Sequence, residues 1–342
     1  MKQWQKIVGI VVGAIVILFL AVCYLLIFRP QIFMGPDSGD TYKAKGLYGN
    51  VSDLFFVNEN TGIALSSLTY PEKPDSVIVF RTTDAGHNWL PILELPEYAH
   101  AFNAIKIGSC VFCAIKNDSI FSLLCVDVLS GNHTLSNDKL SSLPILFQYD
   151  NKLGYAANRV FYTTDNVFEA TDSIGNYDKR PSNNGIAVIG NHIYGFIFDK
   201  DSCVNKLYDF TDKTIIDNFF THGDASLIRS SSHSCLILTA RNEMTVIMYE
   251  FDCIKGTILQ RAIYDAKMLQ PLKTENGIIY TLVSDGPFAD NHLLLGDKSW
   301  QLNINVCLNQ SNITAYSLYE NYFFYYASLH HIVKIYINSH KL

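Results

Sequence analysis

Apolar and polar residues follow one another in short runs along most of this chain. Runs rich in Ile, Val, Tyr and Phe are separated by Asn, Asp and Gly. Beyond residue 28, no segment holds the apolar period of about 3.6 that an amphipathic helix requires. The pattern predicts an all-β fold built from many short strands.

One pattern recurs along the chain, in which a polar turn residue is followed by an apolar strand. Its copies are spaced at intervals of 40 to 49 residues, starting at Asn60, Ser109, Asn151, Asn191, His233, Asn276 and Asn321. Units of this length with about four strands are typical of β-propeller blades, since one such sheet cannot bury its face alone. The sequence predicts a seven-bladed propeller. Six or eight blades are the alternatives, because the copy at His233 is weakly marked.

The last unit is one strand short. After Asn321 two strands fit, and no room remains for another before Leu342. An incomplete sheet would leave an open edge that favours aggregation. We therefore expect residues 41–47 to pair with the last unit, so that the propeller spans residues 41–342.

An apolar stretch at residues 7–28 precedes the repeats and contains no charged residue. A helix rising ~1.5 Å per residue over this length spans the ~30 Å hydrocarbon core of a membrane. The stretch is longer than the apolar region of a cleavable signal peptide. It is predicted to be one N-terminal transmembrane anchor, and removal by cleavage or lipidation at Cys23 are the alternatives.

The charges that flank this anchor predict its orientation. Lys2 and Lys6 precede it, and Arg29 is the nearest cation behind it. The positive-inside rule therefore places residues 1–6 in the cytoplasm. Residues 29–40 would then be a linker at the inner (plasma) membrane, and the propeller would lie in the periplasm or outside the cell.

A compact motif lies in the first repeat, where TTDAGHNW sets Thr82, Asp84, Gly86 and Trp89 at fixed offsets. It resembles the Asp box, or BNR repeat, of sialidase-type propellers, whose pattern is Ser/Thr-x-Asp-x-Gly-x-Thr-Trp. Asn88 stands in place of the usual Thr. The first repeat as a whole is also similar to propellers of the photosystem II assembly factor type.

A degenerate second copy lies in the third repeat, where Thr163 and Asp165 are present without the Gly or the Trp. In such a hairpin the Asp accepts hydrogen bonds from turn N–H groups, and Gly adopts a positive φ that other residues resist. The Trp ring covers the neighbouring strand. The resemblance places the box at the propeller periphery, away from a sialidase active site, so we expect a structural role.

The residues that a sialidase needs are not recognisable in this sequence. Sialidases bind the substrate carboxylate with three arginines, the first in an Arg-Ile-Pro segment, and no arginine here begins Arg-Ile-Pro. No Ser-His-Asp order, phosphate-binding loop or paired-carboxylate motif is found either. We therefore predict no catalytic residue, no cofactor and no enzyme activity.

Seven cysteines follow the apolar stretch, and an odd number leaves at least one unpaired. Cys110 and Cys113 form a CxxC, but residues three apart on a strand point to opposite faces, so we predict no metal site. A two-residue loop at Asn117 and Asp118 would set Cys110 opposite Cys125. A cross-strand disulfide between them is one hypothesis, and two buried free thiols are the alternative.

The formal net charge is −6, with no cluster of basic residues after the N-terminus, which argues against a nucleic-acid partner. Loops on a rigid scaffold are where recognition concentrates. The sequence therefore favours a membrane-anchored, extracytoplasmic, non-catalytic propeller that binds a protein, such as an envelope assembly factor or an immunity or inhibitor protein. A glycan-binding or glycan-hydrolysing protein of sialidase-like architecture is the alternative.

Overall fold

The described part of the protein is made of strands and turns. The computed structural model describes residues 40–69, 75–96, 98, 100–222, 225–229, 235–242, 245–265, 268–275, 278–284, 291–296, 302–308, 315–320, 322–327 and 331–336. Within these ranges no helix is long and apolar enough to cross a membrane. The anchor expected at residues 7–28 lies outside the described residues. The all-β prediction is confirmed for the described part.

The strands of the described chain form seven antiparallel sheets of four strands each. The first sheet contains β2 (Asn50–Phe56), β3 (Gly62–Leu68), β4 (Ser76–Thr82) and β5 (Leu90–Pro96). The second contains β6 (His100–Ile107), β7 (Cys110–Asn117), β8 (Ile120–Asp127) and β9 (His133–Leu135). The third contains β10 (Ile145–Tyr149), β11 (Lys152–Ala157), β12 (Val160–Thr164) and β13 (Thr171–Asn176).

The later sheets repeat this order along the chain. The fourth contains β14 (Pro181–Ile189), β15 (His192–Asp199), β16 (Val204–Asp209) and β17 (Thr214–Thr221). The fifth contains β18 (Ala225–Arg229), β19 (Cys235–Asn242), β20 (Thr245–Asp252) and β21 (Thr257–Asp265). The sixth contains β22 (Met268–Glu275), β23 (Ile278–Ser284), β24 (Asn291–Gly296) and β25 (Leu302–Leu308). The seventh contains β26 (Ala315–Tyr319), β27 (Tyr322–Ala327), β28 (His331–Tyr336) and β1 (Asp40–Lys43).

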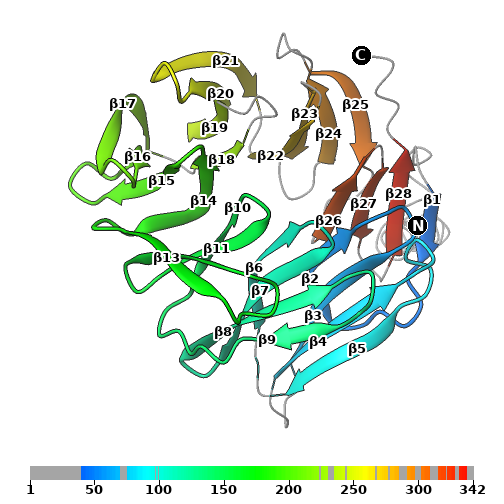
Figure 1. Ribbon diagram of the computed structural model, residues 1–342. Coiled ribbons are helices and arrows are strands. Elements are labelled where there is room, and N and C mark those ends of the chain that lie inside the picture. The colour runs from blue at the N-terminus through cyan, green and yellow to red at the C-terminus, as the bar shows by residue number, and fades with distance from the viewer. Residues whose placement is uncertain are drawn as a thin grey trace, which may run out of the picture.

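The hydrophobic core lies between neighbouring sheets, which are arranged around a common centre (Figure 1). One cluster joins the seventh sheet to the first and includes Phe56, Phe324 and Ile332. Further clusters join the first sheet to the second, the second to the third, the third to the fourth and the fourth to the fifth. The first four sheets thus bury apolar side chains on both faces, which is how propeller blades are stabilised.

The recurring turns of the sequence fall at equivalent places in the fold. Asn60, Ser109, Asn151 and Asn191 each lie between the first and second strands of their sheets. The other three copies lie between β18 and β19, β22 and β23, and β26 and β27, outside the described residues. The sequence repeat therefore corresponds to the structural repeat.

The strand expected to complete the last unit is β1. It pairs antiparallel with β28, with Thr41 opposite Val333, and forms the edge of the seventh sheet. The segment that follows it buries Ala44 and Leu47 in the cluster between the seventh and first sheets. The prediction that residues near 41–47 supply this strand is confirmed, with the strand itself at Asp40–Lys43.

The register predicted for the second sheet is wrong by two residues. Asn117 pairs with Ile120, so the two-residue turn is Asp118–Ser119, where Asp118 adopts a φ of 52°. Cys110 therefore lies opposite Asp127, and Cys125 lies opposite Phe112. The turn forms one residue later than expected because Asp118 takes the left-handed conformation that a short hairpin requires.

Candidate functional site

The Asp84 carboxylate caps the turn between β4 and β5. Its Oδ1 accepts hydrogen bonds from the Thr82 hydroxyl at 2.8 Å and from the Asn88 backbone N–H at 2.9 Å. Its Oδ2 accepts a hydrogen bond from the Asn88 side-chain amide at 2.7 Å. Burial alone would raise the pKa of Asp84, but these hydrogen bonds outweigh it and lower the pKa. The carboxylate is therefore occupied by its own turn.

Gly86 and Trp89 join this turn to the core. Gly86 has a φ of 93°, which favours glycine, and its carbonyl accepts a hydrogen bond from the Trp89 indole N–H at 2.7 Å. The Trp89 ring is only 2% exposed and meets Phe56 edge to face. The backbone N–H of Trp89 donates to the Lys45 carbonyl at 2.8 Å, so the turn also holds the segment that follows β1.

Equivalent turns in later sheets are also capped by aspartate. The Asp127 carboxylate accepts the Ser130 N–H at 2.7 Å, and the Asp252 carboxylate accepts the Ile254 N–H at 3.0 Å. Each of these acids ends the third strand of its sheet. An Asp at or just after the end of the third strand caps these turns because they leave backbone N–H groups that need an acceptor.

The degenerate copy of the motif also has an Asp that caps its turn, but a different aromatic residue packs the turn against the core. Asp165 Oδ1 accepts the Val167 and Glu169 N–H groups at 3.2 and 3.1 Å. Phe168, with a φ of 59°, packs edge to face on Phe112. Thr163 is buried in β12. An aromatic residue thus anchors this turn to the second sheet at a different position from that of the Trp in the first copy.

The cysteine pair singled out in the sequence consists of free thiols in the structure. Cys110 and Cys125 lie diagonally on one face of the second sheet, in the cluster between the second and third sheets. Burial raises the pKa of both thiols. A buried thiol with a raised pKa is a poor nucleophile and a poor metal ligand at neutral pH. These side chains act as small apolar residues.

His192, Asp209 and Asp212 form a group of metal-ligand types that sequence reasoning missed. The His192 ring lies 2.8 Å from Asp209 Oδ2, and Asp209 Oδ1 accepts the Thr211 and Asp212 N–H groups at 2.9 and 3.2 Å. Asp209 ends β16, the same place that Asp127 and Asp252 occupy in their sheets. This group is therefore another capped turn.

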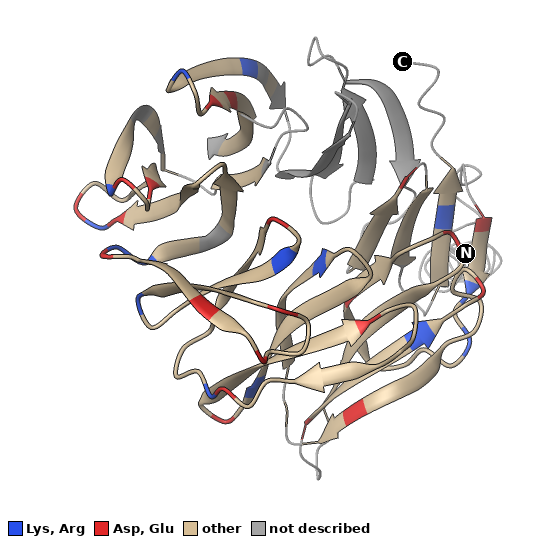
Figure 2. Cartoon of the chain, in the orientation of Figure 1, with Lys and Arg blue, Asp and Glu red and all other residues tan. Residues whose placement is uncertain are grey.

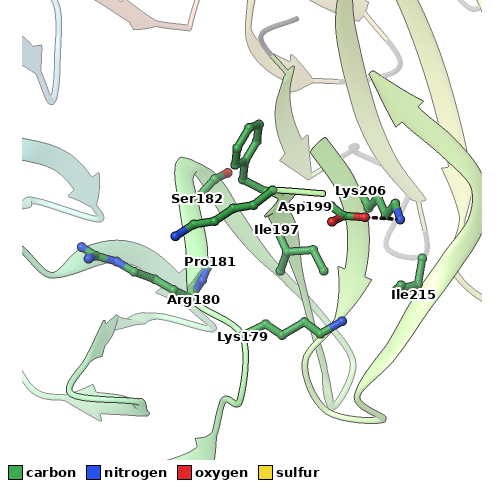
Figure 3. Close-up of a pocket in the computed structure, with 10 residues that line it drawn as sticks. Lys179, Arg180, Pro181, Ser182, Ile197, Asp199, Lys206 and Ile215 are labelled. Atoms are coloured by element: carbon green, nitrogen blue, oxygen red, sulfur yellow. Dashed lines mark hydrogen bonds and ion pairs between the residues drawn. The ribbon is translucent and has the colours of Figure 1, made fainter. Parts of the chain in front are cut away.

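A pocket of about 510 Å³ lies on the fourth sheet and is the candidate functional site (Figure 3). It is called the fourth-sheet pocket below. Its floor includes Pro181, Ile197 and Lys206, which are in register across β14, β15 and β16 and so point to one face. Its rim is formed by the connection between β13 and β14 and by the turn after β15.

Basic side chains dominate the charge of this pocket. Lys179, Arg180, Lys200 and Lys206 line it together with one acid, Asp199. Asp199 Oδ2 lies 2.6 Å from Lys206 Nζ, and hydrogen bonds from Lys206, Ser202 and the Asp201 N–H hold the pKa of Asp199 well below its usual range. Asp199 therefore stays ionised and neutralises Lys206. Across the described chain, charged residues lie largely at turns and strand ends (Figure 2).

Among the residues that the structure describes, no carboxylate forms an ion pair with the remaining cations of the pocket. Lys179 Nζ lies 5.2 Å from the centre of the Tyr208 ring. Within the described ranges, neither Arg180 nor Lys200 forms an ion pair. Figure 3 shows Arg180 extending away from the Asp199–Lys206 pair. The rim thus presents positive charge on a chain whose net charge is −6.

The pocket also offers apolar surface and one unused hydroxyl. Ile215 is 38% exposed, although it is a large apolar side chain. The Ser182 hydroxyl oxygen is buried and has no hydrogen-bond partner in the described part of the protein. Buried polar groups are nearly always hydrogen-bonded, so a lone buried hydroxyl at a pocket wall is available to a ligand.

Sequence reasoning did not identify the pocket. The basic residues come from segments about 20 positions apart, Lys179–Arg180 and Lys200–Lys206. The signal was a basic pair directly before a strand and a second basic residue after the next strand. Only the pairing of β14 with β15 brings the two together.

No protein-family model matches the chain, and no curated protein matches it in sequence. Solved structures do match in fold. A chain of the mitotic checkpoint complex shares 13% identity with a TM-score of 0.57, covering 90% of this chain and 97% of that one. YCF48, solved bound to a D1 peptide, shares 9% identity with a TM-score of 0.52, covering 90% and 99%.

A putative 6-phosphogluconolactonase from Bacteroides fragilis is also similar, with 12% identity and a TM-score of 0.51, covering 79% of this chain and 88% of that one. At such low identities the likeness concerns the fold alone. The chain has a β-propeller fold. Because these similar structures include a peptide-bound protein and a putative enzyme, the fold does not decide the function of this chain.

Proposed function

We propose that this protein is a non-catalytic, seven-bladed propeller that binds a protein partner through the rim of the fourth-sheet pocket. The observation that carries the proposal is the composition of the pocket, which is lined by the exposed cations Arg180 and Lys200 and by the partly exposed apolar side chain of Ile215. Arginine is enriched at protein interfaces. Each four-stranded sheet is one blade in this proposal.

The proposal includes the cellular setting inferred from the sequence. Residues 7–28 form the anchor, residues 1–6 lie in the cytoplasm, and residues 41–342 form the propeller in the periplasm or outside the cell. The uncharged length of the stretch and the cations that flank it support this assignment. A reporter enzyme that works only outside the cytoplasm should be active when fused after Leu342. Activity of a reporter that works only in the cytoplasm, fused at the same place, would contradict the orientation.

We further assign the turn at residues 82–89 to the Asp-box type and give it a structural role. The capping by Asp84 and the packing of Trp89 support the assignment, since both are what such a motif requires. Arg81, the arginine beside the motif, donates from Nε to the Val128 carbonyl at 2.8 Å and so ties the first sheet to the second. It is not positioned as a substrate-binding arginine.

A glycan-binding or glycan-hydrolysing role is the competing function. It requires several arginines and acids that converge on one site. The fourth-sheet pocket supplies one arginine and one acid, and that acid is paired with Lys206. The pocket therefore favours protein binding.

Cross-linking in the native membrane, followed by mass spectrometry of the full-length protein, tests the proposal. We expect a protein to be cross-linked through residues of the pocket rim. Recovery of glycan fragments at the rim, or cross-links that never include it, would contradict the proposal.

A further inference from the structure

The ligand chemistry of the fourth-sheet pocket can be inferred from its charges, and this inference rests on the proposed function. We propose that the pocket binds an acidic segment of a protein partner, with carboxylates at Arg180 and Lys200 and an apolar side chain against Ile215. The sites for charge and for apolar contact line one pocket. The ligand is thus a segment in which acidic and apolar residues alternate or adjoin.

The positive charge is the first reason for this choice of ligand. Asp199 neutralises Lys206 across 2.6 Å, which leaves the exposed side chains of Arg180 and Lys200 without an ion pair in the described chain. The guanidinium group forms paired hydrogen bonds with a carboxylate, and it binds such groups better than an ammonium does. A carboxylate at the rim therefore meets Arg180 and Lys200, neither of which forms an ion pair within the described chain.

An exposed apolar side chain is the second reason. Ile215, which lies opposite Tyr208 in the adjoining strand pair, exposes 38% of its surface. Phe198 exposes 54% of its surface, but it follows Ile197 in β15 and so points to the opposite face of the sheet from the pocket floor. A small hydrophilic anion would leave the Ile215 side chain in water, whereas an apolar side chain of a protein segment would cover it.

The Ser182 hydroxyl is an independent third observation. Its oxygen is buried at the pocket wall without a partner in the described residues. A buried hydroxyl without a hydrogen bond costs free energy, and a backbone or side-chain group of a bound segment relieves that cost. If the bound segment uses this hydroxyl, Ser182→Ala should weaken binding of the segment without lowering the free energy of unfolding.

Fluorescence anisotropy of the full-length protein in nanodiscs tests the inference. The probe is a short labelled peptide in which glutamate alternates with leucine, and two matched peptides carry glutamine for glutamate or serine for leucine. We expect only the glutamate and leucine peptide to bind. The double variant Arg180→Glu and Lys200→Glu should weaken its binding at least about tenfold, the effect of losing one charge-assisted contact.

Lys152→Glu is the matched control, because Lys152 is an exposed lysine at the start of β11, outside the pocket. It should leave binding unchanged. Equal binding of the glutamine peptide, or unchanged binding by the double variant, would overturn the inference. Competition by inorganic phosphate as strong as that by the peptide would instead indicate a small-anion site and would also overturn it.

Cross-linking of the double variant separates this inference from the proposed function. If a partner is captured by both the native chain and the double variant at the same yield, the ligand chemistry is wrong and protein binding stands. If the native chain captures no partner, the proposed function itself fails. Binding that is lost in the double variant alone supports both.

Discussion

The Asp84 turn and the fourth-sheet pocket use polar side chains in opposite ways. At the turn, both carboxylate oxygens of Asp84 accept hydrogen bonds from neighbouring residues, and Trp89 is 2% exposed. In the pocket, Arg180 has no carboxylate partner in the described chain, and the Ser182 hydroxyl is buried and unpaired. Groups that are satisfied within the fold stabilise it. Groups that line the pocket and have no partner within the described fold are available for binding.

Among the changes that affect stability, deletion of residues 40–47 should have the largest effect. The seventh sheet would lose β1, and the neighbouring core would lose Ala44 and Leu47. We expect a loss of at least about 5 kcal/mol in the free energy of unfolding, seen as a broad or absent thermal transition by circular dichroism. Lys43→Ala, an exposed position in the same strand, is the control. An unchanged melting temperature of the deletion variant would contradict the role of β1.

Trp89→Ala should come next, because it removes a buried ring from the cluster that joins the seventh and first sheets. The expected cost is about 3 to 5 kcal/mol in the free energy of unfolding. Trp89→Phe should cost less, since it keeps an aromatic ring against Phe56. Chemical denaturation of the three proteins measures the order, and equal stability of Trp89→Ala and the native chain would show that the ring does not support the fold.

Asp84→Ala should cost about 1 to 3 kcal/mol, because it leaves the Asn88 N–H and the Thr82 hydroxyl without their acceptor. Asp165→Ala should cost less, about 0.5 to 1.5 kcal/mol, since within the described chain it leaves two backbone N–H groups, those of Val167 and Glu169, without their acceptor. Thermal unfolding of both variants gives the comparison. A larger loss at Asp165 than at Asp84 would reverse our ranking of the two copies.

The smallest expected effect is the change with pH in the stability that Asp84 contributes. Burial opposes ionisation of Asp84, but hydrogen bonds from Asn88 and Thr82 lower its pKa in the folded protein. Its contribution to stability is thus present above its unfolded pKa of about 3.9 and is lost as the pH falls through the lower folded value. The stability gap between the native chain and Asp84→Asn should therefore narrow at acid pH. A gap that widens as the pH falls would contradict the sign of this shift.

The fold could be predicted from the sequence because its units repeat at a regular spacing and its turns have characteristic polar residues. The spacing of turns such as Asn60 and Asn151 predicted the units, and the missing strand of the last unit predicted the pairing of residues near Thr41 with β28. Local geometry was less accurate, because one residue, Asp118, fixes the register of the second sheet through its positive φ. The pocket depends on contacts between Pro181, Ile197 and Lys206, which only the strand pairing creates.

Parallel measurement of unfolding and partner capture on two variants tests the central claim most directly. Asp84→Ala should lower the melting temperature and still capture the cross-linked partner at temperatures below its transition. The double variant Arg180→Glu and Lys200→Glu should unfold within about 0.5 kcal/mol of the native chain and lose the partner, because both side chains are exposed. Partner loss by fully stable Asp84→Ala, with capture retained by the double variant, would contradict the account.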